Sequence, residues 1–345
     1  MLTARELALA GVAVTLVERG RTGQESSWAG GGILSPLYPW RYDDAVTQLA
    51  SWSQARYEAL SGALLQESGV DSEWTRSGML LLDPGDAEAA MAWGARLGVA
   101  IERLAGDEAF AREPALGRAP PETLWMPDVA QVRNPRLVRA LRGSLEHLGV
   151  HIREGTPVTG LILDGERARG VSLAEGPLYA DAVVIAGGAW SGQLLGDIAR
   201  LDVEPVRGQM LLFRTAPGTV RRILLQGGRY VIPRRDGHVL AGSTLEHVGY
   251  DKSVTEQARD DLWRAAVGLM PALAACPLQQ HWSGLRPGSP AGIPYVGQVK
   301  GIKGLFANAG HFRNGVVLGP GSARLLADLL LQRPPAVDPA AYAIS

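Results

Sequence analysis

The first eighteen residues constrain the fold more than any other stretch of the sequence. Leu2–Ala10 is rich in helix-forming residues, and Gly11 follows it as a helix-ending residue. The mostly apolar run Val12–Val17 predicts a short buried strand, and Glu18 ends it. This order matches the second half of a dinucleotide-binding βαβ unit, in which the terminal acid hydrogen-bonds the adenosine ribose. Taken alone, Glu18 would more often be an ordinary surface acid, because many α/β units end a strand in this way.

The glycine-rich phosphate loop of such a unit normally lies about 20 residues before the acid. Counting back from Glu18 places this loop before Met1, so the first strand and the loop are missing from the sequence. We expect the start codon to have been assigned too late. The alternatives are a fragment of a longer chain and a protein that does not bind a dinucleotide.

The composition limits the class of protein and its partners. Lys and Arg number 34 against 35 Asp and Glu, which leaves no electrostatic footprint for nucleic acid or an anionic membrane. No apolar run reaches the roughly 18 residues that a spanning helix needs, and Arg5 and Glu6 interrupt any signal-peptide core. The single Cys276 cannot form an intramolecular disulfide, and the histidines form no zinc-binding pattern. We therefore expect a cytoplasmic globular protein.

Later segments alternate between helical and strand patterns. We expect helices between about residues 40 and 118, a meander of strands from 156 to 185, and a mainly β section from 206 to 242. An amphipathic helix is expected over 134–148, a further helix over about 255–270, and a strand, a glycine-flanked turn and a helix over 304–330. Asp181–Ile185 is an apolar strand followed by a second glycine-rich turn, where open α/β sheets bind ligands.

Four short motifs carry a family resemblance: Arg207–Met210, Tyr230–Arg234, Trp282–Pro287 and Gly310–Gly315. In this order they resemble the D-amino-acid oxidase family of flavoproteins, and most closely its glycine oxidase branch, which serves bacterial thiamine biosynthesis. The resemblance covers nearly the whole chain, and the last two motifs are its most specific part. Ala291 stands where many relatives carry Asp, a departure that we expect to affect only a local turn.

The resemblance implies an α/β fold of two domains. A Rossmann-like FAD-binding domain, without its first strand and glycine loop, would consist of residues 1–40, 135–205 and 282–345. An α+β substrate domain with a large antiparallel sheet would consist of residues 41–134 and 206–281. Family members of the glycine oxidase branch form homo-oligomers, which implies the same here.

The resemblance also implies the cofactor contacts. Cys276 lies outside any flavin-attachment pattern, so FAD is expected to bind noncovalently. From the adenosine end to the flavin ring, the implied contacts are Glu18 and Arg19 at the ribose, Val158 at the adenine, Ala186 and Gly187 nearby, Ser26, Ser27, Gly31, Gly32 and Ile33 along the cofactor, and His311, Phe312, Asn314, Gly315, Val316 and Val317 at the flavin. The residues support the last group independently, because a helix start after a glycine-flanked turn presents unpaired N–H groups to a flavin.

An amino-acid substrate presents a carboxylate, which the planar guanidinium of arginine pairs with best. The resemblance selects Arg286 as the principal carboxylate partner, Arg313 as a second active-site cation and Tyr230 as a hydroxyl donor. The implied reaction is oxidation of glycine or a small D-amino acid by FAD and O2, giving a 2-oxo acid, ammonia and hydrogen peroxide. Positioning and electrostatics suffice for it without a protein acid or base.

Two other functions remain open at this level. One is a dehydrogenase of the same fold that acts on D-amino acids or N-methylglycines and passes electrons to a quinone or another carrier. The other is a non-catalytic remnant that has lost FAD together with its phosphate loop. Peroxide release with glycine separates the first from an oxidase, and flavin absorbance of the purified protein decides the second.

Overall fold

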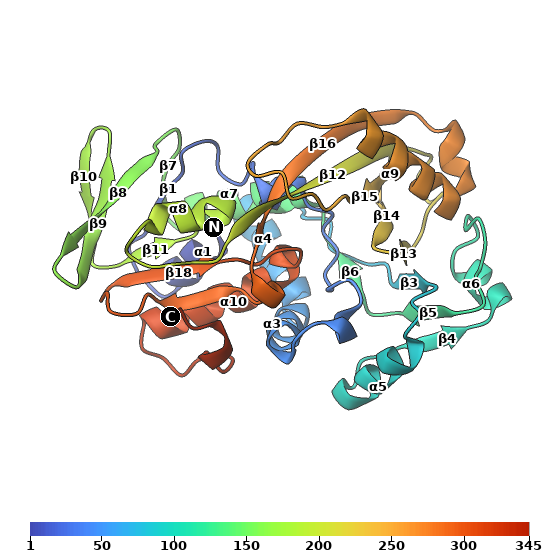
Figure 1. Cartoon of the computed structure of the whole chain (residues 1–345), viewed down its shortest axis with the longest axis horizontal. Helices are drawn as coiled ribbons and strands as arrows, with labels where there is room; N and C mark the ends of the chain where they lie inside the picture. Colours follow the sequence, from blue (N-terminus) through green and yellow to red (C-terminus); the bar gives the residue numbers. More distant parts are fainter. Residues whose placement is uncertain (345) are drawn as a thin grey trace.

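The computed structural model describes residues 1–344. The molecule is elongated, with several small sheets and both chain termini towards one end and a large sheet towards the other (Figure 1). Helices and strands occur in both parts. The α/β fold class expected from the sequence is confirmed.

The N-terminal unit has the predicted order of helix, glycine turn and strand, but the strand is shorter than expected and none of its three residues is fully buried. Helix α1 (Leu2–Leu9) is followed by β1 (Thr15–Val17), which pairs in parallel with β7 (His151–Arg153). Gly11 turns the chain between helix and strand at φ +82°, a conformation that favours glycine. Helix α7 (Asn134–His147) leads into β7 and packs against α1.

A second group of strands lies beside this unit. Strand β11 (Val183–Ile185) pairs in parallel with β18 (Leu305–Ala309), and β17 (Tyr295–Gln298) pairs antiparallel on the other side of β18. In the described residues β1 and β11 belong to separate sheets. The remaining elements here are the antiparallel meander β8 (Val158–Asp164), β9 (Arg167–Leu173) and β10 (Gly176–Tyr179), and the helices α2 (Ser26–Ala29), α8 (Ser191–Leu195) and α10 (Gly315–Leu330).

The large sheet has eight strands in the order β16-β12-β15-β14-β13-β3-β5-β4. We expected it to be antiparallel, but β13 pairs with β3 in parallel, so the sheet is mixed. This pair joins strands from two distant chain segments, which no local pattern reveals. The bounds are β3 (Met79–Leu82), β4 (Glu102–Leu104), β5 (Thr123–Met126), β12 (Glu204–Arg214), β13 (Ile223–Gln226), β14 (Arg229–Pro233), β15 (His238–Gly242) and β16 (Leu278–Gly288).

The segment 40–118, expected to be helical, is only partly so. Helices α3 (Asp44–Gln54), α4 (Tyr57–Ser68), α5 (Ala87–Leu97) and α6 (Gly106–Arg112) form, but β3 and β4 lie among them. All four residues of β3 are buried, so the strand lacks the alternation that would distinguish it from a helix. Two short strands, β2 (Thr75–Arg76) and β6 (Ala130–Gln131), pair beside the large sheet.

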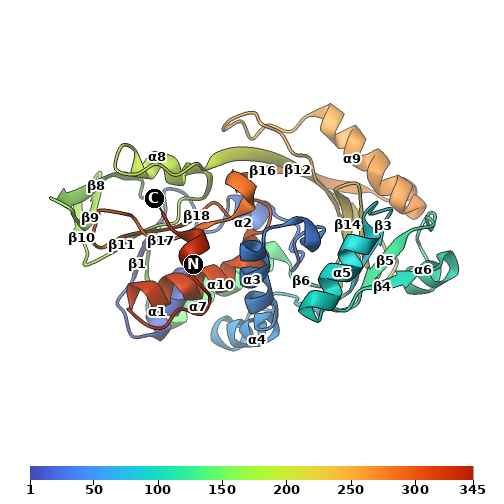
Figure 2. The same cartoon turned by 60° about the horizontal axis from the view of Figure 1, so that its bottom comes forward.

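The two faces of the large sheet are covered differently. Leu211, Phe213 and Val231 point to one face, where α9 (Glu256–Leu269) packs with Leu262 and Ala266. Met210, Tyr230 and Ile232 point to the other face, which α5 covers at one end (Figure 2). Towards β12 and β16 this second face instead meets the chain around α2, because Trp282 Nε1 donates to the carbonyl of Ala29 at 3.1 Å.

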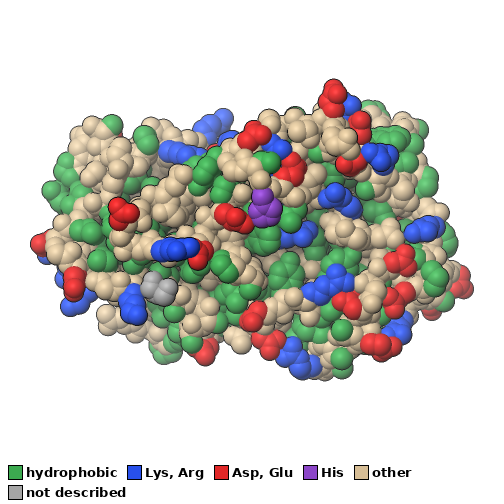
Figure 3. Space-filling view, viewed as in Figure 1, with side chains coloured by type: hydrophobic (Ala, Val, Ile, Leu, Met, Phe, Trp, Pro, Cys, Tyr) green, Lys and Arg blue, Asp and Glu red, His purple; other side chains and the backbone are tan. Residues whose placement is uncertain are grey.

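The surface carries acidic and basic side chains interspersed on the face that Figure 3 shows. Within residues 1–344, no helix combines the length and the apolar character that crossing a bilayer requires.

Candidate active site

Arg286 lies on β16, opposite Val206 of the adjacent strand β12. Its Nη1 donates to the carbonyls of Arg207 at 3.3 Å and Thr244 at 3.2 Å, and its Nη2 donates to Ser243 Oγ at 2.7 Å. All three acceptors are neutral. The guanidinium is therefore fixed in orientation, while its charge remains without a carboxylate partner among these contacts.

Tyr230 and Arg313 are brought to Arg286 from other elements. Tyr230 lies on β14, is buried, and directs its hydroxyl to Met210 Sδ at 3.4 Å. Burial holds the pKa of Arg286 below its ordinary value; Tyr230 acts against this effect, and the charge of Arg313 acts with it. The structure thus gathers the three residues predicted to bind substrate, and their catalytic roles stay predictions.

The turn that follows β18 is tied to the end of β16. Phe312, at φ +46°, donates its backbone N–H to the carbonyl of Pro287 at 2.8 Å. Asn314 then donates to the carbonyl of His311 at 3.0 Å, and α10 begins at Gly315. This turn therefore places the N-terminus of a sixteen-residue helix close to Arg286.

Two side chains of this turn have polar atoms without partners. His311 Nε2 and Asn314 Nδ2 are buried and make no hydrogen bond with the residues that the structure describes. Burial lowers the pKa of His311 to about 4, so its imidazole is neutral at neutral pH. The following residues are held by packing, since Tyr57 donates to the carbonyl of Val316 at 2.8 Å and Val317 is buried.

The triple-glycine segment crosses the face of the large sheet. A Cβ on Gly31 would lie 2.8 Å from Ile232 Cδ1 and 3.3 Å from Tyr230 Cε2. Gly32 adopts φ +80°, and a Cβ there would lie 2.0 Å from the carbonyl oxygen of Val132. Ile33, next along the chain, forms an isolated bridge with Gln131. These glycines are required because the backbone approaches its neighbours this closely.

The residues predicted to contact the adenosine also lie together. Glu18 Oε1 accepts from the N–H of Gly20 at 2.8 Å, and the guanidinium of Arg19 lies 3.8 Å from the ring centre of Trp190. Trp190 follows Ala186 and Gly187 directly after β11, so the ends of β1 and β11 meet at this point. Two other predicted positions begin elements: Val158 opens β8, and Ser26 and Ser27 open α2, where the carbonyl of Ser27 accepts from Asn134.

A polar cluster behind Arg286 was missed by the sequence analysis. Glu246 accepts from Arg207 Nε at 3.0 Å, from Gln209 Nε2 at 2.9 Å and from the hydroxyl of Thr244. Burial acts to raise the pKa of Glu246, but the hydrogen bonds from Thr244, Arg207 and Gln209 outweigh it, and the pKa lies below its usual value. The carboxylate therefore holds the backbone to which Arg286 donates. The only signal in the sequence was the Arg207–Met210 motif.

These features fit a flavin. The unpartnered Nε2 of His311 and Nδ2 of Asn314, together with the free N–H groups at the start of α10, present hydrogen-bonding groups and positive dipole in one place. A flavin offers acceptors at its pyrimidine side and gains negative charge there on reduction. The polar groups that lack hydrogen-bond partners among residues 1–344 are thus groups to which a flavin could bind.

The family model described as FAD dependent oxidoreductase matches residues 1–329. The chain belongs to this FAD-dependent oxidoreductase family. The family expected from the four motifs is thereby confirmed, and with it dependence on FAD.

Several relatives of this FAD-dependent oxidoreductase match along nearly their full length. The glycine oxidase of Pseudomonas aeruginosa is 51% identical over 345 residues, covering 99% of this chain and 95% of that protein. The glycine oxidase of Pseudomonas putida is 48% identical, covering 99% of this chain and 94% of that protein. The crystal structure of glycine oxidase from Geobacillus kaustophilus has a TM-score of 0.93 at 28% identity, covering 100% of this chain and 95% of that chain.

Proposed function

We propose that this oxidoreductase oxidises glycine, or a D-amino acid of similar size, with O2 as the final electron acceptor. The products are the 2-oxo acid, ammonia and hydrogen peroxide. The observation that carries the proposal is the guanidinium of Arg286, oriented by three neutral acceptors and placed beside Tyr230 and Arg313. The similarity to two glycine oxidases at about half identity supports the choice of substrate.

Arg286 binds the substrate carboxylate in this proposal. A buried guanidinium that contacts only neutral groups keeps its full attraction for an anion, and its planar fork matches a carboxylate. Glu246, whose negative charge acts on Arg286, is already bonded to Arg207, Gln209 and Thr244, so it does not compete. Arg313 makes no ion pair or hydrogen bond within residues 1–344 and supplies a second positive charge. Tyr230 donates its hydroxyl to the same carboxylate.

The remaining predicted residues hold the cofactor. Glu18 and Arg19 contact the adenosine ribose, with Val158, Ala186 and Gly187 nearby. Ser26, Ser27 and Gly31–Ile33 follow the cofactor to the ring, and His311–Val317 line its pyrimidine side. When bound noncovalently, FAD supplies the acceptor for the hydride that leaves the substrate Cα. The neutral His311 and Asn314 satisfy ring acceptors and exclude water from them.

The division into two domains also belongs to the proposal: residues 1–40, 135–205 and 282–345 bind FAD, and residues 41–134 and 206–281 form the substrate domain. The boundaries at 205 and 282 fall within β12 and β16, which pair along almost their whole length. These two strands would therefore belong to both domains. A cytoplasmic location, a homo-oligomeric state and a role in thiamine biosynthesis complete the proposal.

The experiment is peroxide release under air by the purified, flavin-containing protein. Glycine and D-alanine are compared with L-alanine, and ammonia is measured in parallel. We expect glycine to give equal amounts of peroxide and ammonia. Ammonia without peroxide in the presence of an artificial electron acceptor would identify a dehydrogenase. A protein without flavin absorbance after incubation with FAD would contradict the proposal altogether.

A further inference from the structure

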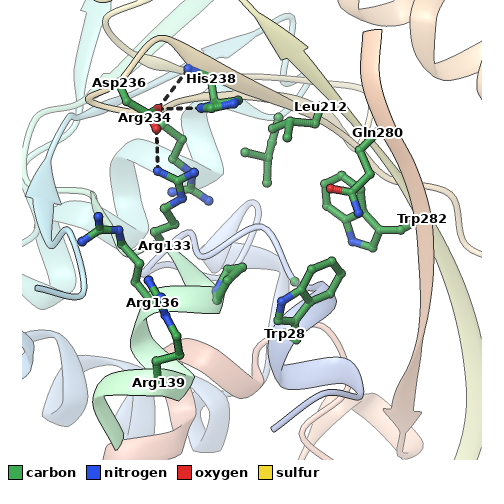
Figure 4. A pocket seen from close by; sticks show the side chains of 13 residues that line it. Trp28, Arg133, Arg136, Arg139, Leu212, Arg234, Asp236, His238, Gln280 and Trp282 are labelled. Carbon is green, nitrogen blue, oxygen red and sulfur yellow. Dashed lines mark hydrogen bonds and ion pairs between the residues drawn. The ribbon is translucent and has the colours of Figure 1, made fainter. Parts of the chain in front are cut away.

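A cavity of about 330 Å³ lies beside the candidate active site. Helix α7, strands β12, β15 and β16 and the segment at Trp28 and Gly30 line it (Figure 4). Neither Arg286, Tyr230 nor Arg313 belongs to its lining. The reaction proposed above leaves the cavity without a role, and its size falls within the range of small-molecule sites.

One wall of the cavity is basic. Arg133 immediately precedes α7, and Arg136 and Arg139 lie three residues apart on the helix, so the three follow one another along the same side. Figure 4 shows their side chains together on one side of the cavity, with Arg234 close to them. Arg133 pairs with Asp236 at 2.8 Å.

Arg234 is a buried cation without an acidic partner. It is only 7% exposed, and it donates to Gln131 Oε1 at 2.6 Å and to the carbonyls of Val132 at 2.9 Å and Gly31 at 2.7 Å. All three acceptors are neutral, and Nε has no partner among residues 1–344. Burial and the charge of Arg133 lower its pKa to about 10, so the group remains charged at neutral pH. A buried charge of this kind favours an anion nearby.

The charges of this wall are only partly compensated. Arg136 pairs with Glu73 at 2.8 Å, and Arg133 pairs with Glu73 as well as with Asp236. Arg139 is exposed and makes neither an ion pair nor a side-chain hydrogen bond with the described part of the chain. Four guanidinium groups thus face two carboxylates, which leaves an excess of positive charge at the cavity.

The opposite wall is aromatic and apolar. The rings of Trp28 and Trp282 are 5.9 Å apart at an interplanar angle of 67°, and Leu212 and Leu240 adjoin them. Figure 4 shows the two indoles across the cavity from the arginines of α7. Such a wall binds a flat apolar group, while the guanidinium wall binds an anionic one.

We propose that this cavity binds a small aromatic anion. Its phosphate or carboxylate group lies at Arg136 and Arg139, and its ring packs against Trp28 and Trp282. Both anionic groups match the guanidinium fork, so the experiment compares them directly. The proposal concerns a site other than that of the amino-acid substrate and does not depend on the oxidase activity.

The probes are phenyl phosphate, benzoate, benzyl alcohol and inorganic phosphate. Each is titrated into the flavin-containing protein and followed by calorimetry and tryptophan fluorescence. The candidate active site is first saturated with acetate, which carries the substrate's carboxylate but has no amine to oxidise. We expect one of the two aromatic anions to bind with a stoichiometry of one and to quench tryptophan emission. Benzyl alcohol and inorganic phosphate should each bind at least about ten-fold more weakly, because each lacks one half of the recognised structure.

Arg139→Gln tests the site without disturbing an ion pair of the fold. We expect it to weaken binding of the aromatic anion about ten-fold or more. Arg200→Gln is the control, since Arg200 is also exposed but lies in a loop outside the cavity. The affinity of this variant for the aromatic anion should equal that of the wild type. Three results would overturn the proposal: no binding by either aromatic anion, wild-type affinity in Arg139→Gln, or equal affinity for inorganic phosphate and phenyl phosphate. Glycine oxidation is measured separately, so failure of one proposal leaves the other standing.

Discussion

The guanidinium of Arg286 lies directly over the α-carbon of Gly208. A Cβ on Gly208 would lie 2.2 Å from both Nη1 and Nη2 of Arg286. The space for the cation proposed to bind substrate therefore exists because the adjacent strand carries a glycine at this position. The absence of a side chain at one residue determines where the charge of another can lie.

Replacing Gly208 should therefore displace Arg286 without unfolding the protein. In Gly208→Ala we expect KM for glycine to rise about ten- to a hundred-fold, the loss expected when a charge-assisted pair is misaligned. The backbone of Gly208 does not require positive φ, so the urea midpoint should change little. Gly62→Ala, in α4 with no atom near its Cβ, is the control and should keep the wild-type KM. An unchanged KM in Gly208→Ala would contradict this placement of the carboxylate site.

Arg286→Lys retains the positive charge but loses the planar fork. We expect KM for glycine to rise about a hundred-fold and kcat to fall much less, because the lost interaction is mainly one of binding. Steady-state kinetics at several O2 concentrations measures both quantities. Flavin absorbance should be unchanged, which separates substrate binding from cofactor loss. Equal KM values for the variant and the wild type would refute the carboxylate role of Arg286.

Glu246 should act on substrate binding through Arg286 rather than by contact. Glu246→Gln removes the charge that pairs with Arg207, whose side chain is only 5% exposed. Because Arg207 keeps its ion pair with Asp251, we expect the free energy of unfolding to fall by only about 1–2 kcal/mol and KM to rise several-fold. Glu204→Gln, at an exposed carboxylate near His247, is the control. A variant with lower stability but wild-type KM would show that Glu246 is purely structural.

His311 predicts a specific pH dependence of stability. Burial lowers its pKa to about 4 in the folded protein, against 6.5 when unfolded. As the pH falls, the unfolded chain therefore takes up a proton before the folded protein does. The free energy of unfolding is highest above pH 6.5 and declines as the pH falls towards 4. The change is about 3 kcal/mol. Urea unfolding of His311→Gln should show a smaller decline over this range, whereas His151→Gln, at an exposed histidine, should follow the wild type. Parallel curves for the two variants would disprove the assignment.

Gly32→Ala should lower the free energy of unfolding by more than the positive φ of this residue alone would. Its φ of +80° is unfavourable for alanine by about 1–2 kcal/mol, and its Cβ would lie 2.0 Å from the carbonyl of Val132. Gly165→Ala, at φ +55° with no atom within 4 Å, carries the angular cost alone. We expect Gly32→Ala to lose at least about 2 kcal/mol more than Gly165→Ala in chemical unfolding and to bind FAD more weakly. Equal losses would show that the backbone adjusts around Gly32.

The elements that could be predicted are those whose signal lies within a short stretch of chain. The change from helix to strand at Gly11, the amphipathic residues of α7 and the apolar run before Ala186 each identify one element. Strand β3 could not be found this way, because Met79–Leu82 is buried on both faces and its neighbours come from distant segments. Local periodicity carries no information about which strand completes a sheet.

The residues of the candidate site also fall into two groups, those that sequence motifs predict and those that only the tertiary structure reveals. Arg286, Arg313 and Tyr230 stand in motifs that the sequence displays, and the structure brings them together. Ser243 and Glu246 stand in a turn without a recognisable pattern, and they meet Arg286 and Arg207 only through pairing in the large sheet. The basic wall beside Trp28 likewise combines α7 with the turn after β14. Such contacts depend on tertiary structure and leave no mark in a single sequence.

The paired strands β12 and β16 run eleven residues each, and Arg286 lies near one end of this ribbon. Two strands joined by hydrogen bonds resist bending far more than a loop does. The β12–β16 pair is therefore a rigid connection between the two parts of the molecule. We therefore expect the two parts of the molecule to keep their relative position during turnover, and small molecules to reach the candidate active site by local movement of the surrounding turns.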